Sequence, residues 1–396
     1  MGRFLSAVVV GLLSTGLAFA DDTRIATWNL GAAWDGAVEA RASQFEAAAA
    51  AVAADVYVVQ EIMSLTTAEA IADRLGIDDP FIAVSDFAAT SEQEDDDAKA
   101  NVFFHLEVGV ISTVPIVSAQ ELEFDRDDAT GPLVNKTSIS TRPGRLFVPP
   151  LVFDRLSSQT KNALAFGRGV LKVELEGDLV IYVVHSKSDF NGFCANVQST
   201  VQLLTEVERK SDEEAGLDAA DVDTLNGALE VLARIQTAEE ATSFSKEWVR
   251  NAEKREAVFS ALIEKVKADV AAGKTVMVMG DYNIALNDPR SGKDLANDCN
   301  PTRMCFSPVA DALCNGQDGL DESHYILAGG VDPAVAMKPL TADLTETLTG
   351  TFSSAIDHIY VAGLRAENFS MAETFKDSDG KGFGSDHLPV LVTLTD

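Results

Sequence analysis

Polar residues stand at the ends of several apolar stretches, where packing alone gives no reason for them. In the stretch VMVMGDYN, the apolar run breaks at Gly280 and is followed at once by Asp281 and Asn283. Layered folds collect their functional groups at strand ends, so we expect such residues from separate strands to meet in one site. The residues concerned are Asn29, Glu61, His185, Asp281 with Asn283, and Asp357, and the stretch GSDHLPV adds Asp386 and His387 before the last apolar run.

Three of these residues offer oxygen atoms to a metal ion. Glu61 and Asp386 carry hard carboxylate ligands, and Asn29 carries a neutral amide oxygen. This combination suits Mg²⁺, which keeps several waters and meets its substrate through phosphate oxygens. We predict a Mg²⁺ site at these residues, with Mn²⁺ as an alternative ion and a structural Ca²⁺ in the acidic loops as a further option.

The remaining residues suit the hydrolysis of a phosphate ester. Asp281, steadied by Asn283, can take the proton of an attacking water. His185 and His387 can hold the charge that develops on a phosphate or protonate a leaving oxygen, and Asp357 can fix the tautomer of His387. The set as a whole predicts metal-assisted phosphoester hydrolysis.

Each residue alone also has a structural interpretation. Asn29 and Glu61 are ordinary residues for a strand end, and His358, which stands beside Asp357, is expected to be structural. His105 and His324 have no companions in the sequence, so we assign them no function. No nucleophile elbow or triad spacing supports a serine or cysteine nucleophile.

Apolar stretches and one alanine-rich segment predict the elements that position these residues. We expect many strands with few helices between them, which implies an α/β sandwich of two mixed or mainly antiparallel sheets with helices outside. The strands are expected at 24–30, 56–62, 107–117, 168–175, 179–188, 275–283, 355–363 and 388–394, and the helices at 37–56 and 246–272.

The first twenty residues and the cysteines both indicate export. Residues 1–20 combine Arg3, an apolar run and a small-residue ending at Ala18 and Ala20, which predicts a cleaved signal peptide and a secreted or periplasmic protein. An even set of four cysteines is typical of disulfides in an oxidising compartment, although three connectivities and a zinc site are alternatives. The simplest pairing joins Cys299 with Cys305 and Cys194 with Cys314.

The charge balance limits the kind of partner. There are 62 acidic against 31 basic residues, a net charge of -31, which repels polyanions at long range. Salt screens this repulsion beyond about 8 Å. The charge therefore argues against a broad basic face, but not against phosphate chemistry in one pocket. We expect no stable membrane association and predict no protein partner.

The mature chain is predicted to be a single decorated domain over 21–396. No Pro- or Gly-rich linker divides it. Three segments look inserted: an acidic loop at 85–100, an irregular stretch at 119–165 and an acidic, helical excursion at 205–245.

Six blocks, in this order along the chain, resemble the endonuclease/exonuclease/phosphatase superfamily, whose members are similar to deoxyribonuclease I. The blocks are TWNL, VVQE, VVHSKS, GDYN, SAIDHI and GSDHLPV, and they extend over roughly 24–394. The resemblance implies a four-layer α-β-β-α sandwich with its site at one end of the paired sheets. The block HSKS is similar to that of exported bacterial members.

The resemblance also assigns roles. Matched block to block, it implies that Glu61 is the main metal ligand with Asn29 and Asp386 nearby, and that Asp281 and Asn283 activate water. It implies that His185 and His387 contact the scissile phosphate and that Asp357 pairs with His387. Two substrate-binding residues, Arg168 in FGRG and Lys187 in HSKS, and two helix residues, Asn251 and Arg255, also match family positions.

The substrate stays open at this point. A secreted nuclease is one hypothesis, and a phosphodiesterase or phosphatase acting on a sphingolipid head group, an inositol phosphate or a nucleotide is another. A secreted binding protein that kept the scaffold without catalysis is the third. No aromatic or basic loop for gripping a DNA groove stands out in the sequence.

Overall fold

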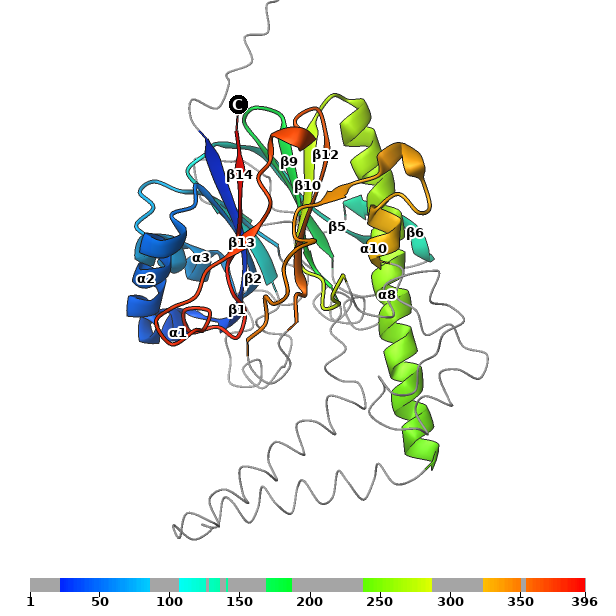
Figure 1. The fold of residues 1–396 in the computed structure, drawn as a ribbon, viewed down its shortest axis with the longest axis horizontal. Helices are drawn as coiled ribbons and strands as arrows, with labels where there is room; N and C mark the ends of the chain where they lie inside the picture. Colours follow the sequence, from blue (N-terminus) through cyan, green and yellow to red (C-terminus); the bar gives the residue numbers. More distant parts are fainter. Residues whose placement is uncertain are drawn as a thin grey trace, which may run out of the picture.

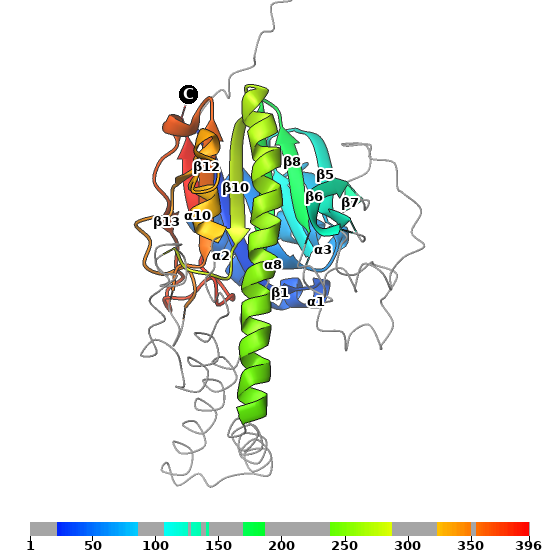
Figure 2. The same cartoon turned by 90° about the vertical axis from the view of Figure 1, so that its right-hand side faces the viewer.

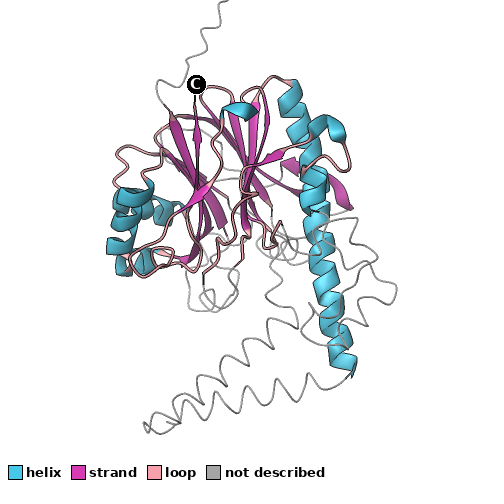
Figure 3. Ribbon diagram, in the orientation of Figure 1, coloured by secondary structure: helices cyan, strands magenta, loops and turns pink. Residues whose placement is uncertain are grey.

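Two β-sheets pack face to face and carry helices on their outer faces. The computed structural model describes residues 22–85, 107–125, 128–135, 140–141, 169–186, 238–286, 323–349 and 354–395. Within these residues each sheet has seven strands. Figure 1 shows the two sheets packed against each other. Coloured by element type, the helices lie on both sides of the paired sheets (Figure 3). The prediction of a four-layer α-β-β-α sandwich is confirmed.

The first sheet is mixed. Its central strand β1 runs parallel to β2 and antiparallel to β14, and β2 runs antiparallel to β4. In spatial order its strands are β13 (Glu373–Thr374), β14 (Val390–Leu394), β1 (Thr23–Ala33), β2 (Val56–Ile62), β4 (Glu107–Ser112), β3 (Phe81–Val84) and β7 (Ser140–Thr141).

The second sheet is also mixed, and its centre is β10. This strand runs parallel to β9 and antiparallel to β12. In spatial order the strands are β11 (Lys338–Pro339), β12 (Asp357–Gly363), β10 (Thr275–Asp281), β9 (Leu179–His185), β8 (Val170–Leu175), β5 (Ile116–Asp125) and β6 (Asp128–Asn135).

The helices divide between the two outer layers. Helices α1 (Asp35–Ala40), α2 (Ala42–Val52) and α3 (Leu65–Arg74) cover the first sheet. Helix α8 (Ala238–Ala271) runs along the outer face of the second sheet and extends beyond it at one end (Figure 2), with α10 (Ser323–Leu327) beside it. Two 3₁₀ turns, η4 (Pro333–Val335) and η5 (Ala366–Asn368), complete the described elements. None of the helices in the described residues combines the length and the apolar character that a membrane span needs.

Strict alternation along the central strands separates the core between the sheets from the outer cores. In β10, Met277 and Met279 pack between the sheets, whereas Val276 and Val278 pack against the helical layer. Side chains in a strand alternate between its two faces, so Asp281 continues the inner row where the apolar residues stop. The same face continues to Asn29 in β1, to His185 in β9 and to Asp357 in β12.

Several element boundaries differ from those expected. The strand expected at 107–117 is two strands in different sheets, because the chain leaves the first sheet after Ser112 and Pro115 precedes β5. The helix expected at 37–56 is interrupted at Arg41 and ends at Val52. The helix expected at 246–272 begins eight residues earlier.

The segment expected to be irregular at 119–165 contains regular structure. Its first residues belong to β5, and β6 and β7 follow, so the expectation was wrong for these strands. Alternating polar and apolar residues in QELEF are a strand pattern, and hydrogen bonds cross from β5 to β6 in an edge hairpin. The signal peptide, most of the expected insertions at 85–100 and 205–245, and all four cysteines lie outside the described residues.

Candidate active site

Three of the expected site residues lie in one row across the second sheet. The strand register places Asp281 opposite His185 on one side and opposite Asp357 on the other. Residues opposite each other on neighbouring strands project from the same face. All three side chains are buried. Residues separated by more than 170 positions therefore come together at the end of the inter-sheet core.

Gly280 allows the row to form. It has a φ of +140°, and a Cβ at this position would lie 1.9 Å from the carbonyl oxygen of Val184 in β9. Backbone atoms cannot yield to such a contact, so a residue with a side chain would separate β10 from β9. The glycine in GDYN is thus required for the close approach that brings Asp281 beside His185.

Glu61 reaches the site because β2 breaks its alternation. Val58 packs between the sheets and Val59 packs against the helices, so an unbroken strand would direct Glu61 to the helical side. Instead the register shifts between Gln60 and Ile62, and Glu61 has a φ of +60°. Such bulges re-aim one side chain, and a left-handed non-glycine residue is costly and commonly functional.

Asn29 joins the carboxylates of the two sheets. Its amide nitrogen Nδ2 donates to Oε1 of Glu61 at 3.2 Å and to Oδ2 of Asp281 at 3.0 Å. Its Oδ1 accepts the backbone N–H of Gly31 at 3.0 Å. Since an N–H can only donate, this contact sets the orientation of the amide. In this geometry Asn29 holds two carboxylates close together, and its role as an oxygen ligand stays a prediction.

His185 faces the same two carboxylates. Its Nε2 lies 3.6 Å from Oε1 of Glu61 and 3.6 Å from Oδ2 of Asp281. The ring is nearly fully buried, whereas the Glu61 side chain is 25% exposed. Glu61 is therefore the member of this group that solvent, a hydrated ion or a substrate reaches first.

The GSDH loop is fastened to the end of β1. The hydroxyl of Ser385 donates to the backbone carbonyl of Asn29 at 2.7 Å and accepts from the backbone N–H of His387 at 3.0 Å. The indole of Trp28 donates to the carbonyl of His387 at 3.3 Å. These bonds bring the last expected site residues against the first sheet.

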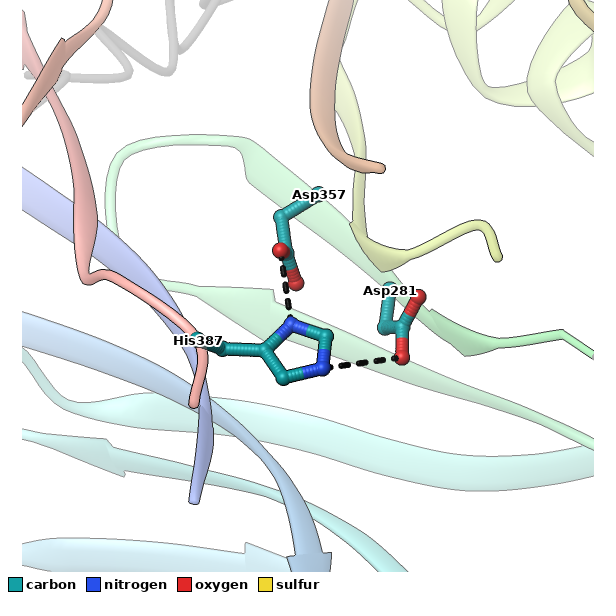
Figure 4. Close-up of side chains that lie close together, drawn as sticks. All are labelled: Asp281, Asp357 and His387. Carbon is teal, nitrogen blue, oxygen red and sulfur yellow. Dashed lines mark hydrogen bonds and ion pairs between the residues drawn. The ribbon is translucent and has the colours of Figure 1, made fainter. Parts of the chain in front are cut away.

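His387 lies between two buried aspartates (Figure 4). Its Nδ1 is 2.8 Å from Oδ2 of Asp357, and its Nε2 is 3.9 Å from Oδ2 of Asp281. Burial lowers the pKa of His387, but the negative charges of Asp357, Asp281 and Asp386 outweigh it and raise that pKa to about 10. The imidazole is accordingly a cation at neutral pH, and Asp357 fixes its orientation as expected.

Asp281 is poised between its charged and neutral forms. Burial raises the pKa of this carboxyl to about 7, opposed by the cation of His387 and reinforced by the charge of Asp357. Hydrogen bonds from the Asn283 N–H and the Asn29 amide favour the charged form. A carboxyl with a pKa near neutrality is suited to take a proton from water.

Asn283 completes the turn after β10. It has a φ of +54°, a conformation that asparagine tolerates better than most residues. Its backbone N–H donates to Oδ1 of Asp281 at 2.8 Å, and its side-chain amide donates to the carbonyl of Ser186 at 3.1 Å. The turn thus links the ends of β10 and β9.

Two parts of the site could hold a metal ion: a buried trio and the side chain of Glu61. Ligand atoms of Asp281, Asp357 and His387 lie within 4.8 Å of one another. In this trio, Nδ1 of His387 is bonded to Asp357 and the imidazole is a cation. A metal needs a free imidazole lone pair, so the trio holds a proton more readily than a metal ion. Glu61, a hard carboxylate that is partly exposed, fits a hydrated divalent ion better.

The other expected site residues are placed less closely or lie outside the described chain. Asp386 is exposed, and its backbone carbonyl accepts two bonds from Thr349. Its Oδ1 lies 3.5 Å from where a Cβ on Gly31 would be, which puts it beside the end of β1. Arg168 and Lys187 lie outside the described residues. Arg255 is buried beneath the second sheet, consistent with a structural role.

Two positioning residues carried no signal in the sequence. The hydroxyl of Thr347 accepts the backbone N–H of Ile356 at 3.0 Å and that of Asp357 at 2.9 Å, so it fixes the start of β12. The guanidinium of Arg41 donates to the carbonyls of Leu30 at 2.7 Å and Gly384 at 3.0 Å. Neither residue stands in a recognisable block, because its partners are backbone atoms, which place no demand on residue type.

No family model and no curated protein matches the chain. Solved structures do resemble it. An AP endonuclease from Archaeoglobus fulgidus has a TM-score of 0.45 at 12% identity, over 94% of this chain and 99% of that one. A Neisseria 3′ phosphatase bound to product DNA hairpin gives 0.44 at 14% identity, over 94% and 99%. An endonuclease/exonuclease/phosphatase family protein from Bacteroides thetaiotaomicron gives 0.42 at 13% identity, over 95% and 98%. The structural neighbours of this chain thus include members of the endonuclease/exonuclease/phosphatase family.

Proposed function

We propose that this protein is a divalent-metal-dependent phosphoesterase that hydrolyses phosphodiester bonds as a secreted or periplasmic nuclease. The observation that carries the proposal is the triad of Asp357, the His387 cation and Asp281 at the end of the inter-sheet core. Glu61, Asn29 and His185 from neighbouring strands meet the same Asp281. The six sequence blocks that resemble the superfamily all carry residues of this site or its immediate supports.

Asp281 is the group that prepares the attacking water. Its pKa of about 7 lets a substantial fraction of the carboxylate accept a proton near neutral pH. Oδ1 is held by the Asn283 N–H and Oδ2 by the Asn29 amide. Both oxygens are therefore fixed in direction before a substrate arrives, which lowers the cost of reaching the reactive geometry.

His387 supplies a positive charge for the phosphate. Its Nδ1 is occupied by Asp357, so the Nε2–H is directed toward the site and toward Asp281. A preorganised cation in a water-poor site stabilises the charge that grows on the phosphoryl oxygens. His185, from the second sheet, is placed to bind a further phosphate oxygen or to protonate the leaving group.

Glu61, with Asn29 and Asp386 near the end of β1, would hold the divalent ion. The fit rests on the partly exposed hard carboxylate of Glu61 and on the bulge that turns it into the site. Bound there, Mg²⁺ would supply Lewis-acid polarisation of a phosphoryl oxygen.

Smaller phosphate esters form a second candidate class of substrate. The net charge of -31 disfavours long polyanions unless a local cationic patch compensates. A nucleotide, an inositol phosphate or a sphingolipid head group would meet less of this repulsion. The chemistry at the scissile phosphate is the same for both classes.

A pair of assays tests the proposal. The purified protein is incubated with plasmid DNA and with bis-p-nitrophenyl phosphate, each with Mg²⁺ and with EDTA. We expect turnover of both substrates that EDTA abolishes. Turnover of the small ester alone would favour the second class of substrate. Absence of turnover on both, in a folded protein supplied with Mg²⁺ or Mn²⁺, would instead support a binding protein.

Export is the other part of the proposal. The sequence of residues 1–20 supports it, together with the even number of cysteines. N-terminal sequencing of the protein recovered from its producing cell tests it: we expect a mature chain that begins at Asp21. A protein that retains Met1 in the cytoplasm would contradict export without affecting the proposed chemistry.

A further inference from the structure

The turn that carries Asp281 and Asn283 rests on a buried aromatic cluster. Between these two residues, Tyr282 points away from the site into the outer core of the second sheet. Its ring stacks on Phe259 of α8 at 5.0 Å and on His324 of α10 at 5.5 Å. It meets His358 of β12 edge-on at 5.3 Å. Three elements thus hold the side chain that separates the two site residues.

Two histidines of this cluster donate to one carbonyl. Nε2 of His324 and Nε2 of His358 each lie 3.1 Å from the backbone oxygen of Ile284. A carbonyl oxygen can only accept, so both histidines carry a proton on Nε2. We call these two histidines with the Ile284 carbonyl the histidine clamp.

The far side of each imidazole is also fixed. Nδ1 of His324 pairs with the hydroxyl of Tyr360 at 2.8 Å, and Nδ1 of His358 pairs with the hydroxyl of Thr341 at 2.9 Å. Both histidines are buried, and their rings meet edge-on at 4.6 Å. Burial, followed by the charge of His324, holds the pKa of His358 well below its usual value. His358 is therefore a neutral hydrogen-bonding residue.

The clamp holds the turn at a point where the backbone needs support. Asn283, immediately before Ile284, has the left-handed φ of +54°. Non-glycine residues persist in such conformations when the surroundings determine them. The next bonds along the chain run from Asn283 N–H to Asp281 Oδ1 and from the Asn283 amide to Ser186. Movement of the Ile284 carbonyl would thus displace Asn283 and, through its N–H bond, Asp281, the residue proposed to activate water.

We propose that His324 and His358 are positioning residues, which hold the Ile284 carbonyl and so keep Asp281 and Asn283 in the geometry that hydrolysis requires. This inference rests on the proposed function for its catalytic consequence. Its structural part concerns the turn alone. His358 also sits next to Asp357 in β12, so one strand presents a site residue to the inner face and a clamp residue to the outer face.

Paired substitutions test the clamp. His324→Phe and His358→Phe keep a ring of similar shape but remove the donor, whereas His324→Gln and His358→Gln keep a donor near the Nε2 position. We expect each phenylalanine variant to lower kcat for bis-p-nitrophenyl phosphate by about ten- to a hundredfold, with KM within about twofold, because small misplacements of reacting groups are costly. The glutamine variants should recover part of the loss.

A matched control separates positioning from general stability. Tyr182→Phe removes a buried hydroxyl that donates to Asp269 at 2.6 Å, on the same outer face but away from the site. It should lower the melting temperature while leaving kcat unchanged. If a folded phenylalanine variant at either histidine keeps its kcat within about twofold of wild type, the proposal is overturned at that histidine.

Hydrogen exchange measures the turn without any turnover. In wild type, the N–H of Tyr282 donates to the carbonyl of Ile356 at 2.9 Å, and that of Asn283 donates to Asp281. We expect both amides to exchange faster in the phenylalanine variants and to be unchanged in Tyr182→Phe. Unchanged exchange at 282–284 would overturn the clamp. If the wild type proves inactive on every ester, the proposed function fails, and this exchange measurement alone decides the clamp.

Discussion

Two buried aspartates, one on the helix that covers the second sheet and one at the end of strand β10, show how a structural acid differs from a reactive one. Asp269 of α8 is bound by both oxygens to Lys172, at 2.9 and 2.7 Å, and its Oδ2 also accepts the hydroxyl of Tyr182 at 2.6 Å. Asp281 instead lies 3.6 Å from His185 and 3.9 Å from His387, with its pKa raised to about 7. The carboxylate of Asp269 is thus paired with a cation in direct contact, whereas the carboxylate of Asp281 has no cation within hydrogen-bonding distance among the described residues.

The difference follows from the two faces of the same sheet. On the outer face, Asp269 is buried between α8 and the sheet, where it binds a lysine and a tyrosine. At the end of the inner face, Asp357 and Asp281 place two carboxyl groups beside the cation of His387. Asp357 Oδ1 has no hydrogen-bond partner among the described residues, although it is buried. Unsatisfied buried polar groups of this kind are common where the group binds a substrate, a water molecule or an ion.

The largest effect should come from removing the cation of the inner group. We expect His387→Gln to lower kcat/KM for bis-p-nitrophenyl phosphate by about a thousandfold, because the variant loses the cation that stabilises the phosphate charge and that lowers the pKa of Asp281. Steady-state kinetics measure the effect, and circular dichroism checks the fold. A folded variant within about tenfold of wild type would remove His387 from the mechanism.

A smaller effect is expected from the partner of that cation. Asp357→Asn keeps the shape of the side chain but removes the charge that raises the pKa of His387. We expect kcat of the variant to be about a hundredfold below that of wild type at pH 8. This difference should be smaller at lower pH, where His387 is again protonated. A loss that is equal at all pH values would show that Asp357 acts through packing alone.

The outer group should show the opposite pattern. Tyr182→Phe removes one hydrogen bond to a buried charge and should cost about 2 kcal/mol in the free energy of unfolding. Activity should not change, because Tyr182 lies on the helical side of β9. Urea unfolding measures the first quantity and ester hydrolysis the second. A marked loss of activity would mean that the two faces of the sheet are coupled.

The pH dependence of stability sharpens the comparison further. The folded pKa of His387, about 10, lies above its unfolded value of 6.5. Its contribution to stability is therefore fully present below pH 6.5 and is lost as the pH rises through about 10. In EDTA, wild type should lose more of its free energy of unfolding between pH 6.5 and 10 than His387→Gln does. Equal losses in the two proteins would contradict the raised pKa.

The sequence predicted the strands and the meeting of their polar ends, because an apolar run that breaks at a polar residue marks the end of a buried strand. It did not predict which face each residue occupies, and the structure places Asp281 and His185 on the face of Met279 and Val183. The bulge at Glu61 is different. Strict alternation would have turned its carboxylate away from the site, so Glu61 was predicted from its place at a strand end, while the bulge that turns it into the site was not predicted.

Contacts between distant backbone and side chains could not be predicted in the same way. His324 had no companion in the sequence, yet it shares the carbonyl of Ile284 with His358 and packs on Tyr282. Nothing local signals such a contact, because the partners come from three different elements. The hairpin of β5 and β6 was missed for a different reason: the alternation in QELEF is a strand signal, but the partner strand DATGPLVN contains Gly and Pro, which weaken a strand pattern.

The metal response of Glu61→Gln tests the central claim most directly, namely that the polar ends of the inner strands form one hydrolytic site around a divalent ion. Hydrolysis of bis-p-nitrophenyl phosphate is followed across Mg²⁺ concentrations for wild type, for Glu61→Gln and for Glu46→Gln, an exposed acid on α2 as control. We expect saturable activation in wild type and control, and a requirement for at least about tenfold more Mg²⁺ in Glu61→Gln. An unchanged Mg²⁺ titration in a folded Glu61→Gln protein would contradict the account.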